Sequence, residues 1–299
     1  MLEKALVVAA ALAGSVFTAI GIVVRQRATM DVPPDRGVST LMLKTLLRRP
    51  LWWAGTGSAV IGYLFYAVAL AYGSLLLVAP LLVAALLFAL PLSAWVSHRR
   101  VTRAEWGWAC MLTAALAAFV SLARTAPGDY EGTVVPAVAV AGLSIMGVAV
   151  CLVAAGRFSD WRRAILLALP VGVLFGVVAV LTKIGTHILT TDGVGRAIAS
   201  PVTYALIVTG VAATLLQQSA FHAGSLSASV PAMLVLEPVV AVALGQVVLG
   251  EHLVVSTPSA VALGAALAAM AAATIALGRD EGAYEDDLEA ASRGAHAGR

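Results

Sequence analysis

Long apolar runs separated by short polar stretches recur from one end of the 299-residue chain to the other. A helix needs about 20 apolar residues to cross a bilayer core about 30 Å thick, and these runs have that length. We therefore expect an all-α, polytopic membrane protein. Nine membrane spans are predicted, at residues 5–24, 51–71, 74–96, 105–123, 133–154, 164–187, 202–220, 226–249 and 256–277.

Composition and charge extend this prediction. Hydrophobic residues make up 61% of the chain and charged residues only 12%, whereas a soluble domain has roughly 25% charged residues. Cytoplasmic loops carry an excess of Lys and Arg, and an arrangement with the N-terminus outside places most of the 19 Lys and Arg residues inside. The exceptions are Lys4, Arg124, Lys183 and Arg196. We expect a multi-pass protein of the cytoplasmic (inner) membrane, with its C-terminus in the cytoplasm.

Three segments outside the spans have patterns of their own. Residues 38–49 combine leucines with basic side chains that can reach lipid headgroups, which predicts a helix lying in the membrane interface. Residues 188–201 show the same pattern more weakly. The last segment, residues 279–299, mixes acidic residues with Gly, Ala and Ser and lacks an apolar face, so a disordered cytoplasmic tail is predicted.

The chain also contains an internal repeat. Residues 73–80 (Gly-Ser-Leu-Leu-Leu-Val-Ala-Pro) match residues 224–231 (Gly-Ser-Leu-Ser-Ala-Ser-Val-Pro), and residues 14–25 share a spaced Gly, Phe and basic residue with residues 172–183. Each half would hold four spans. A single span between the halves would give the second half the opposite orientation, and such inverted repeats are common in secondary transporters.

This repeat predicts the following organisation of the chain. The expected units are a first repeat at 1–124, a linking helix at 125–160, a second repeat at 161–278 and the tail at 279–299.

Several motifs resemble the drug/metabolite transporter (EamA-like) superfamily. They are Leu-Glu-Pro-Val-Val-Ala at residues 236–241 and Leu-Gly-Glu at 249–251. The nine spans, Trp-Trp-Ala-Gly at 52–55 and the short hairpin at 71–74 resemble most the NIPA-type magnesium transporters and their bacterial relatives. The resemblance implies transport of a small solute or of magnesium. Where the first half would carry the counterpart of Glu251, it has Arg100.

Glu237 is the strongest candidate for a functional side chain, because it is an acidic residue about halfway along an apolar span. An ionised carboxylate at that depth normally faces a cavity, a partner or a proton path. Pro238 removes a backbone hydrogen bond and frees a carbonyl beside it. Glu237 is therefore expected either to bind the solute or a coupling proton, or to lock neighbouring helices together through a hydrogen bond.

Lys183 lies near the outer end of its span. Its long side chain can snorkel to the headgroups, or it can act as an electropositive gate or a partner of Glu237. A depth difference of about 12 Å between the two residues makes direct pairing with Glu237 the weaker of these hypotheses.

Uncharged polar residues and prolines complete the candidates. Tyr63 and Tyr66 lie about one turn apart in the second span, and Gln217 and Gln218 lie in the seventh. Such groups either line a solute cavity or bond neighbouring helices. Three prolines are candidates for kinks or hinges: Pro80 and Pro231, at matched places in the two halves, and Pro238.

The sequence contains none of the motifs that we associate with hydrolases, metalloproteases or nucleotide-driven pumps. We therefore expect a secondary transporter rather than an enzyme, with no cofactor and no metal ligands that the sequence identifies. A magnesium transporter is the alternative within this class. From another class, the chain would be a non-transporting partner or lipid-handling subunit in cell-envelope assembly. The expected partners are the solute or ion, membrane lipids and a second copy of the chain, but not nucleic acid.

Overall fold

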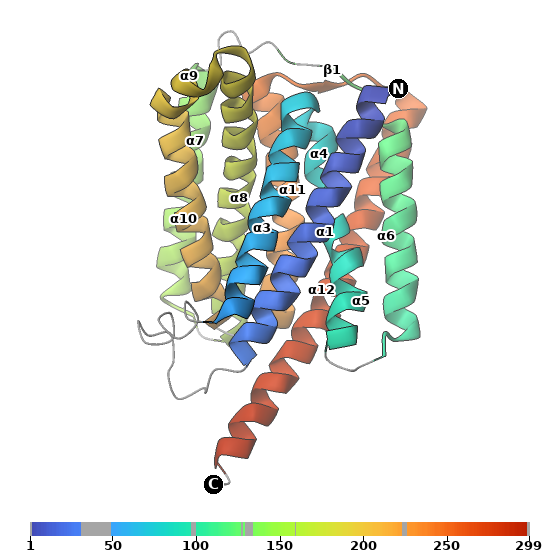
Figure 1. Cartoon of the computed structure of the whole chain (residues 1–299), viewed down its shortest axis with the longest axis vertical. Coiled ribbons are helices and arrows are strands. Elements are labelled where there is room, and N and C mark those ends of the chain that lie inside the picture. Colours follow the sequence, from blue (N-terminus) through green and yellow to red (C-terminus); the bar gives the residue numbers. More distant parts are fainter. Residues whose placement is uncertain are drawn as a thin grey trace.

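The computed structural model describes the backbone of residues 2–30, 49–96, 100–126, 128, 134–158, 160–222 and 226–297. The chain forms one bundle of long helices (Figure 1). The helices are α1 (Leu2–Met30), α3 (Pro50–Tyr72), α4 (Leu75–Leu81), α5 (Ala84–Val96), α6 (Arg103–Leu122), α7 (Val134–Ala155), α8 (Asp160–Thr191), α9 (Gly193–Ala199), α10 (Pro201–His222), α11 (Leu226–Leu249) and α12 (Thr257–Ala297).

Several of these helices are long and apolar enough to cross a membrane, so the chain is a multi-pass membrane protein. Within the described residues there are seven such spans, with α4 and α5 counted together as one. The bent pair α9 and α10, whose axes differ by 58°, would make an eighth. The helix α7 coincides with the predicted linking span, but the described apolar part of it, Ser144–Ala155, is short. The count of nine spans stays a prediction.

The structure tests the predictions for the three segments outside the spans to different degrees. Residues 38–48 lie outside the described part of the structure, and at 188–201 the chain ends α8 and forms the short α9. The prediction of a disordered tail is wrong for the backbone up to Ala297, because α12 continues to that residue. A helix that is already nucleated extends at little cost, and the tail is rich in Ala and Glu, which favour helix.

The helix is interrupted just after Pro80, because α4 ends at Leu81 and α5 begins at Ala84, and a kink or hinge at Pro80 stays a prediction. In the second half, α11 is continuous from Leu226 to Leu249. Neither Pro231 nor Pro238 therefore ends a helix, and kinks at these two residues stay predictions.

Helices of each half pack together through glycines. In the first half (α1 to α6), α1 packs against α3 and α5; in the second half (α8 to α12), α8 packs against α10 and α11. A Cβ atom on Gly21 of α1 would lie 2.9 Å from the Gly55 carbonyl oxygen of α3. A Cβ on Gly172 of α8 would lie 2.8 Å from the Cβ of Leu236 on α11. Glycine at these places permits the close approach of the helices.

We expect Gly21→Ala to destabilise the protein by about 1–3 kcal/mol, because the new methyl group would press on the backbone of α3. Gly57→Ala is the matched control, since a Cβ at Gly57 meets nothing within 4 Å. The control should raise stability slightly, through helix propensity. Thermal unfolding in detergent measures both effects, and equal midpoints for the two variants would contradict the glycine contact.

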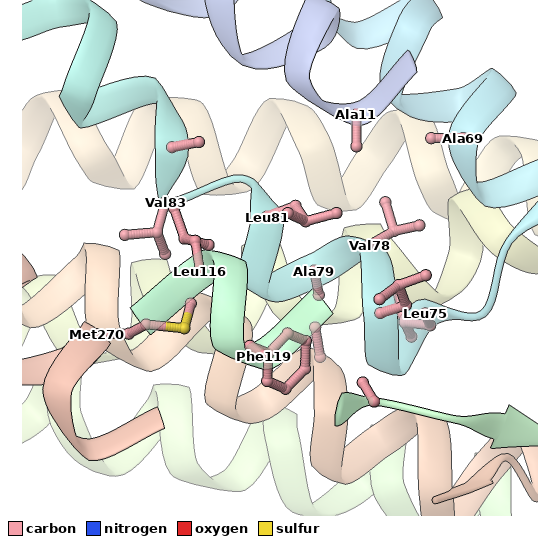
Figure 2. Packing of buried hydrophobic residues seen from close by; sticks show 14 of the residues in the cluster. Ala11, Ala69, Leu75, Val78, Ala79, Leu81, Val83, Leu116, Phe119 and Met270 are labelled. Atoms are coloured by element: carbon pink, nitrogen blue, oxygen red, sulfur yellow. The ribbon is translucent and has the colours of Figure 1, made fainter. Parts of the chain in front are cut away.

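The short helix α4 is enclosed on all sides. Every residue from Leu75 to Leu81 is buried. Figure 2 shows Val78 and Leu81 of α4 within a cluster that includes Ala11 of α1, Phe119 of α6 and Met270 of α12. Because lipid and water cannot reach α4, the free N–H groups at its first turn need partners from the protein.

Two strands of two residues each join the halves at one end of the bundle. β1 (Thr125–Ala126) pairs with β2 (His252–Leu253) in an antiparallel ladder. Figure 1 shows β1 and the N-terminus at the same end and the C-terminus at the opposite end. We call the end that carries β1 and β2 the ladder end.

Candidate functional site

Glu237 is the twelfth of the 24 residues of α11, so it lies midway along that helix. A Cβ on Gly172 would approach its backbone nitrogen to 3.3 Å, which places α8 directly beside it. Among the described residues, none donates a hydrogen bond to the Glu237 carboxylate or offers it an opposite charge. The hypothesis that Glu237 locks helices together through a hydrogen bond therefore finds no partner in the described part of the chain.

Tyr66 of α3 lies close enough to Glu237 for the two side chains to interact electrostatically. Its side chain is 6% exposed, and its hydroxyl has no hydrogen-bond partner among the described residues. A buried hydroxyl without a partner costs about 1–3 kcal/mol, so few proteins retain one without a reason.

Tyr63 lies one turn before Tyr66, with the two ring centroids 6.5 Å apart. Its hydroxyl is 2.8 Å from the hydroxyl of Thr182 on α8. Because the Thr182 hydroxyl donates to the Val178 carbonyl oxygen at 2.7 Å, it accepts the proton of Tyr63. We call Tyr63, Tyr66, Thr182 and Glu237 the polar centre. It draws on α3 from the first half and on α8 and α11 from the second.

The remaining predicted candidates contribute less. Gln217 is partly buried on α10, and no hydrogen bond joins it to the polar centre within the described residues. The side chain of Gln218 lies outside the described part of the structure. Pro238 follows Glu237 within α11, and its missing N–H leaves one backbone carbonyl of that helix without its usual donor.

Lys183 follows Thr182 on α8, but it does not reach the lipid headgroups. Its side chain is 8% exposed, and its ammonium donates to the carbonyl oxygens of Leu70 and Gly73, each at 2.6 Å. These carbonyls belong to the C-terminal end of α3. The prediction that Lys183 snorkels is therefore wrong, because an enclosed helix end supplies better acceptors than the interface does. Its charged neighbour is Glu251 and not Glu237.

Glu251 binds the chain just after these carbonyls, where α3 is followed by α4. It is 2% exposed, and its carboxylate accepts hydrogen bonds from the Ser74 hydroxyl at 2.6 Å and from the backbone N–H groups of Leu75 and Leu76, both at 3.1 Å. Gly250 precedes it with φ of 66°. That left-handed conformation, which glycine adopts without strain, ends α11 and directs the chain toward α4.

We call Lys183 and Glu251, together with the corner between α3 and α4 that they bind, the corner clamp. The charges match the local dipoles, because a cation meets the C-terminus of α3 and an anion meets the N-terminus of α4. The sequence pointed to the Leu-Gly-Glu motif at residues 249–251 only through a family resemblance, and it did not predict the hydrogen bonds of Glu251. A signal for the clamp was present in an acidic residue after an apolar run, but its partner 175 residues away has no local pattern.

Comparison with known proteins finds a relative of this chain over nearly its whole length. No model of a known protein family matches it, and no solved structure matches it. An uncharacterized protein of Corynebacterium glutamicum is 38% identical over 282 residues, which cover 93% of this chain and 96% of that protein. The chain therefore belongs to the same family as this corynebacterial protein.

Proposed function

We propose that the chain is a secondary transporter that moves a small solute across the membrane by alternating access. The observation that carries this proposal is the polar centre, where the Glu237 carboxylate and the Tyr66 hydroxyl both lack hydrogen-bond partners among the described residues. Unmade hydrogen bonds inside a membrane protein are costly. A bound solute that supplies the missing partners accounts for their retention.

The position of the polar centre supports transport rather than a scaffold. Tyr63 and Tyr66 come from the first half, whereas Thr182 and Glu237 come from the second half. In our proposal the two halves are inverted repeats, and the ladder end faces outside. Rocking of one half against the other would then expose the same side chains first to one face of the membrane and then to the other.

The groups of the polar centre also restrict the solute. The Glu237 carboxylate offers only acceptors, and the Tyr63 hydroxyl keeps an acceptor lone pair after donating to Thr182. The Tyr66 hydroxyl adds a donor. In this proposal the solute carries hydrogen-bond donors, and magnesium is a substrate only if it keeps a water shell that donates to these oxygens.

Uptake into proteoliposomes tests the proposal. A panel of labelled small solutes and magnesium is offered to wild type, to Glu237→Gln and to Glu3→Gln, whose exposed carboxylate on α1 is the matched control. We expect at least one solute to accumulate, and Glu237→Gln to lower its uptake about tenfold or more, as the loss of a charge-assisted hydrogen bond would. Glu3→Gln should behave as wild type.

The outcomes separate the parts of the proposal. Absence of uptake across the whole panel contradicts transport. Normal uptake by Glu237→Gln contradicts the role of the polar centre but not transport. Uptake of magnesium alone would favour the cation branch of the resemblance.

A further inference from the structure

We propose that the corner clamp is the latch that closes the ladder end of the solute pathway. This inference rests on the proposed transport function, but it concerns residues that the polar centre does not contain. Lys183 and Glu251 belong to the second half, and the backbone groups that their side chains bind belong to the first half. The clamp therefore holds the two halves together.

The clamp lies directly beside the polar centre, on its ladder side. Lys183 follows Thr182 on α8, and Leu70 lies one helical turn after Tyr66 on α3. Beside the clamp, a Cβ on Gly245 of α11 would lie 2.8 Å from a methyl carbon of Leu76. In our proposal this close contact of α4 and α11 blocks the route of a solute from the polar centre to the ladder end while the clamp is closed.

When the clamp opens, its two charged side chains still have each other as partners. Lys183 and Glu251 already interact electrostatically, and both would move with the second half. They can therefore pair with each other when the first half moves away. The Ser74 hydroxyl also lies 3.1 Å from the Leu76 nitrogen, so α4 keeps a cap from its own residue after Glu251 has left. A purely structural clamp needs neither reserve partner.

Lys4 provides a natural comparison. Its ammonium also donates to two carbonyl oxygens at a helix end, those of Val120 at 2.5 Å and Ala123 at 2.7 Å. Lys4 and these acceptors all belong to the first half, at the same end of the bundle. Loss of the Lys4 bonds should therefore disturb a helix end without separating the halves.

Thiol labelling in nanodiscs tests the latch, because the reagent reaches both faces of the membrane. In a background with Cys110 and Cys151 replaced by serine, one reporter is Ala179→Cys, one turn below Lys183 on α8. The second reporter is Ala168→Cys, about three turns farther from the ladder end on the same helix. Both alanines are buried, with 2% and 0% exposure.

We expect Lys183→Met and Glu251→Gln each to speed labelling of Ala179→Cys about tenfold, as for the loss of one charge-assisted hydrogen bond. Labelling of Ala168→Cys should stay equal or become slower, since the opposite end closes when the ladder end opens. Lys4→Met should change neither rate. If Lys183→Met does not fold, Ser74→Ala removes one bond of the clamp and should shift the rates in the same direction.

Two results overturn the latch. Unchanged labelling of Ala179→Cys in folded variants would make the clamp structural, and faster labelling of both reporters would indicate general loosening. The assay needs no solute, so its outcome is independent of the uptake measurement. If the labelling rates change as expected but no solute is taken up, the clamp still controls access to the ladder end, and the transport proposal is contradicted.

Discussion

Glu251→Ala is expected to lower the free energy of unfolding by about 3–5 kcal/mol, the range seen when one partner of a buried charge pair is removed. The truncation leaves the Ser74 hydroxyl and the N–H groups of Leu75 and Leu76 without their carboxylate acceptor, and it leaves Lys183 without its charged neighbour. Because α4 is enclosed, water cannot replace the lost bonds.

The measurement is the thermal unfolding midpoint in detergent, which should fall by roughly 10 °C at this chain length. Glu3→Ala, at an exposed carboxylate in the first turn of α1, should leave the midpoint unchanged. Glu251→Gln should fall between the two, because an amide retains one acceptor oxygen. Equal midpoints for Glu251→Ala and Glu3→Ala would show that the first turn of α4 does not depend on Glu251.

Tyr66→Phe is expected to move stability and transport in opposite directions. Removing a buried hydroxyl that has no partner should raise the free energy of unfolding by about 1 kcal/mol. If the hydroxyl binds solute, the same change should lower uptake at least tenfold, because a site built to hydrogen-bond its ligand loses much when a partner is absent. A stabilised but inactive variant indicates a group kept for function.

Two tyrosines on the same helix serve as controls for this prediction. Tyr63→Phe removes a made hydrogen bond to Thr182 and should destabilise the protein slightly. Tyr72→Phe, at a side chain that is 77% exposed, should affect neither unfolding nor uptake. If Tyr66→Phe destabilises the protein as Tyr63→Phe does, its hydroxyl has a structural partner and the polar centre loses its main support.

Local patterns predicted much of the fold. The apolar runs located the long helices because the length needed to cross a bilayer restricts them strongly. The helix α4 ends at Leu81, one residue after Pro80, which the sequence marked as a candidate kink or hinge. The depth of Glu237 also followed from counting residues along its span.

The clamp could not be predicted in the same way, because it depends on contacts between residues far apart in the chain. The acceptors of Lys183 are backbone carbonyls 110 and 113 residues earlier, and carbonyls leave no trace in the sequence. The long side chain of Lys183 and its place near the end of a span suggested that it snorkels to the headgroups. In the structure its ammonium instead binds carbonyl oxygens at the enclosed end of α3. The predicted disorder of the tail differs from the structure for another reason. The tail continues the membrane helix α12 up to Ala297, and this continuity outweighs its polar composition.

The two halves also differ at the clamp. Glu251 is buried and accepts three hydrogen bonds, whereas Arg100, which the proposed repeat aligns with Glu251, is exposed and lies outside the helices. The ladder end therefore has an acidic latch residue that the first half does not repeat. In our account the two faces of the membrane close by different contacts, although the halves are proposed to be repeats.

Counterflow tests the central claim, alternating access through the polar centre, most directly. Proteoliposomes are loaded with the unlabelled form of the best solute from the uptake panel and diluted into a trace of its labelled form. We predict a transient accumulation of label above equilibrium for wild type and its loss in Glu237→Gln. Simple equilibration without an overshoot in wild type would indicate a pore and contradict alternating access.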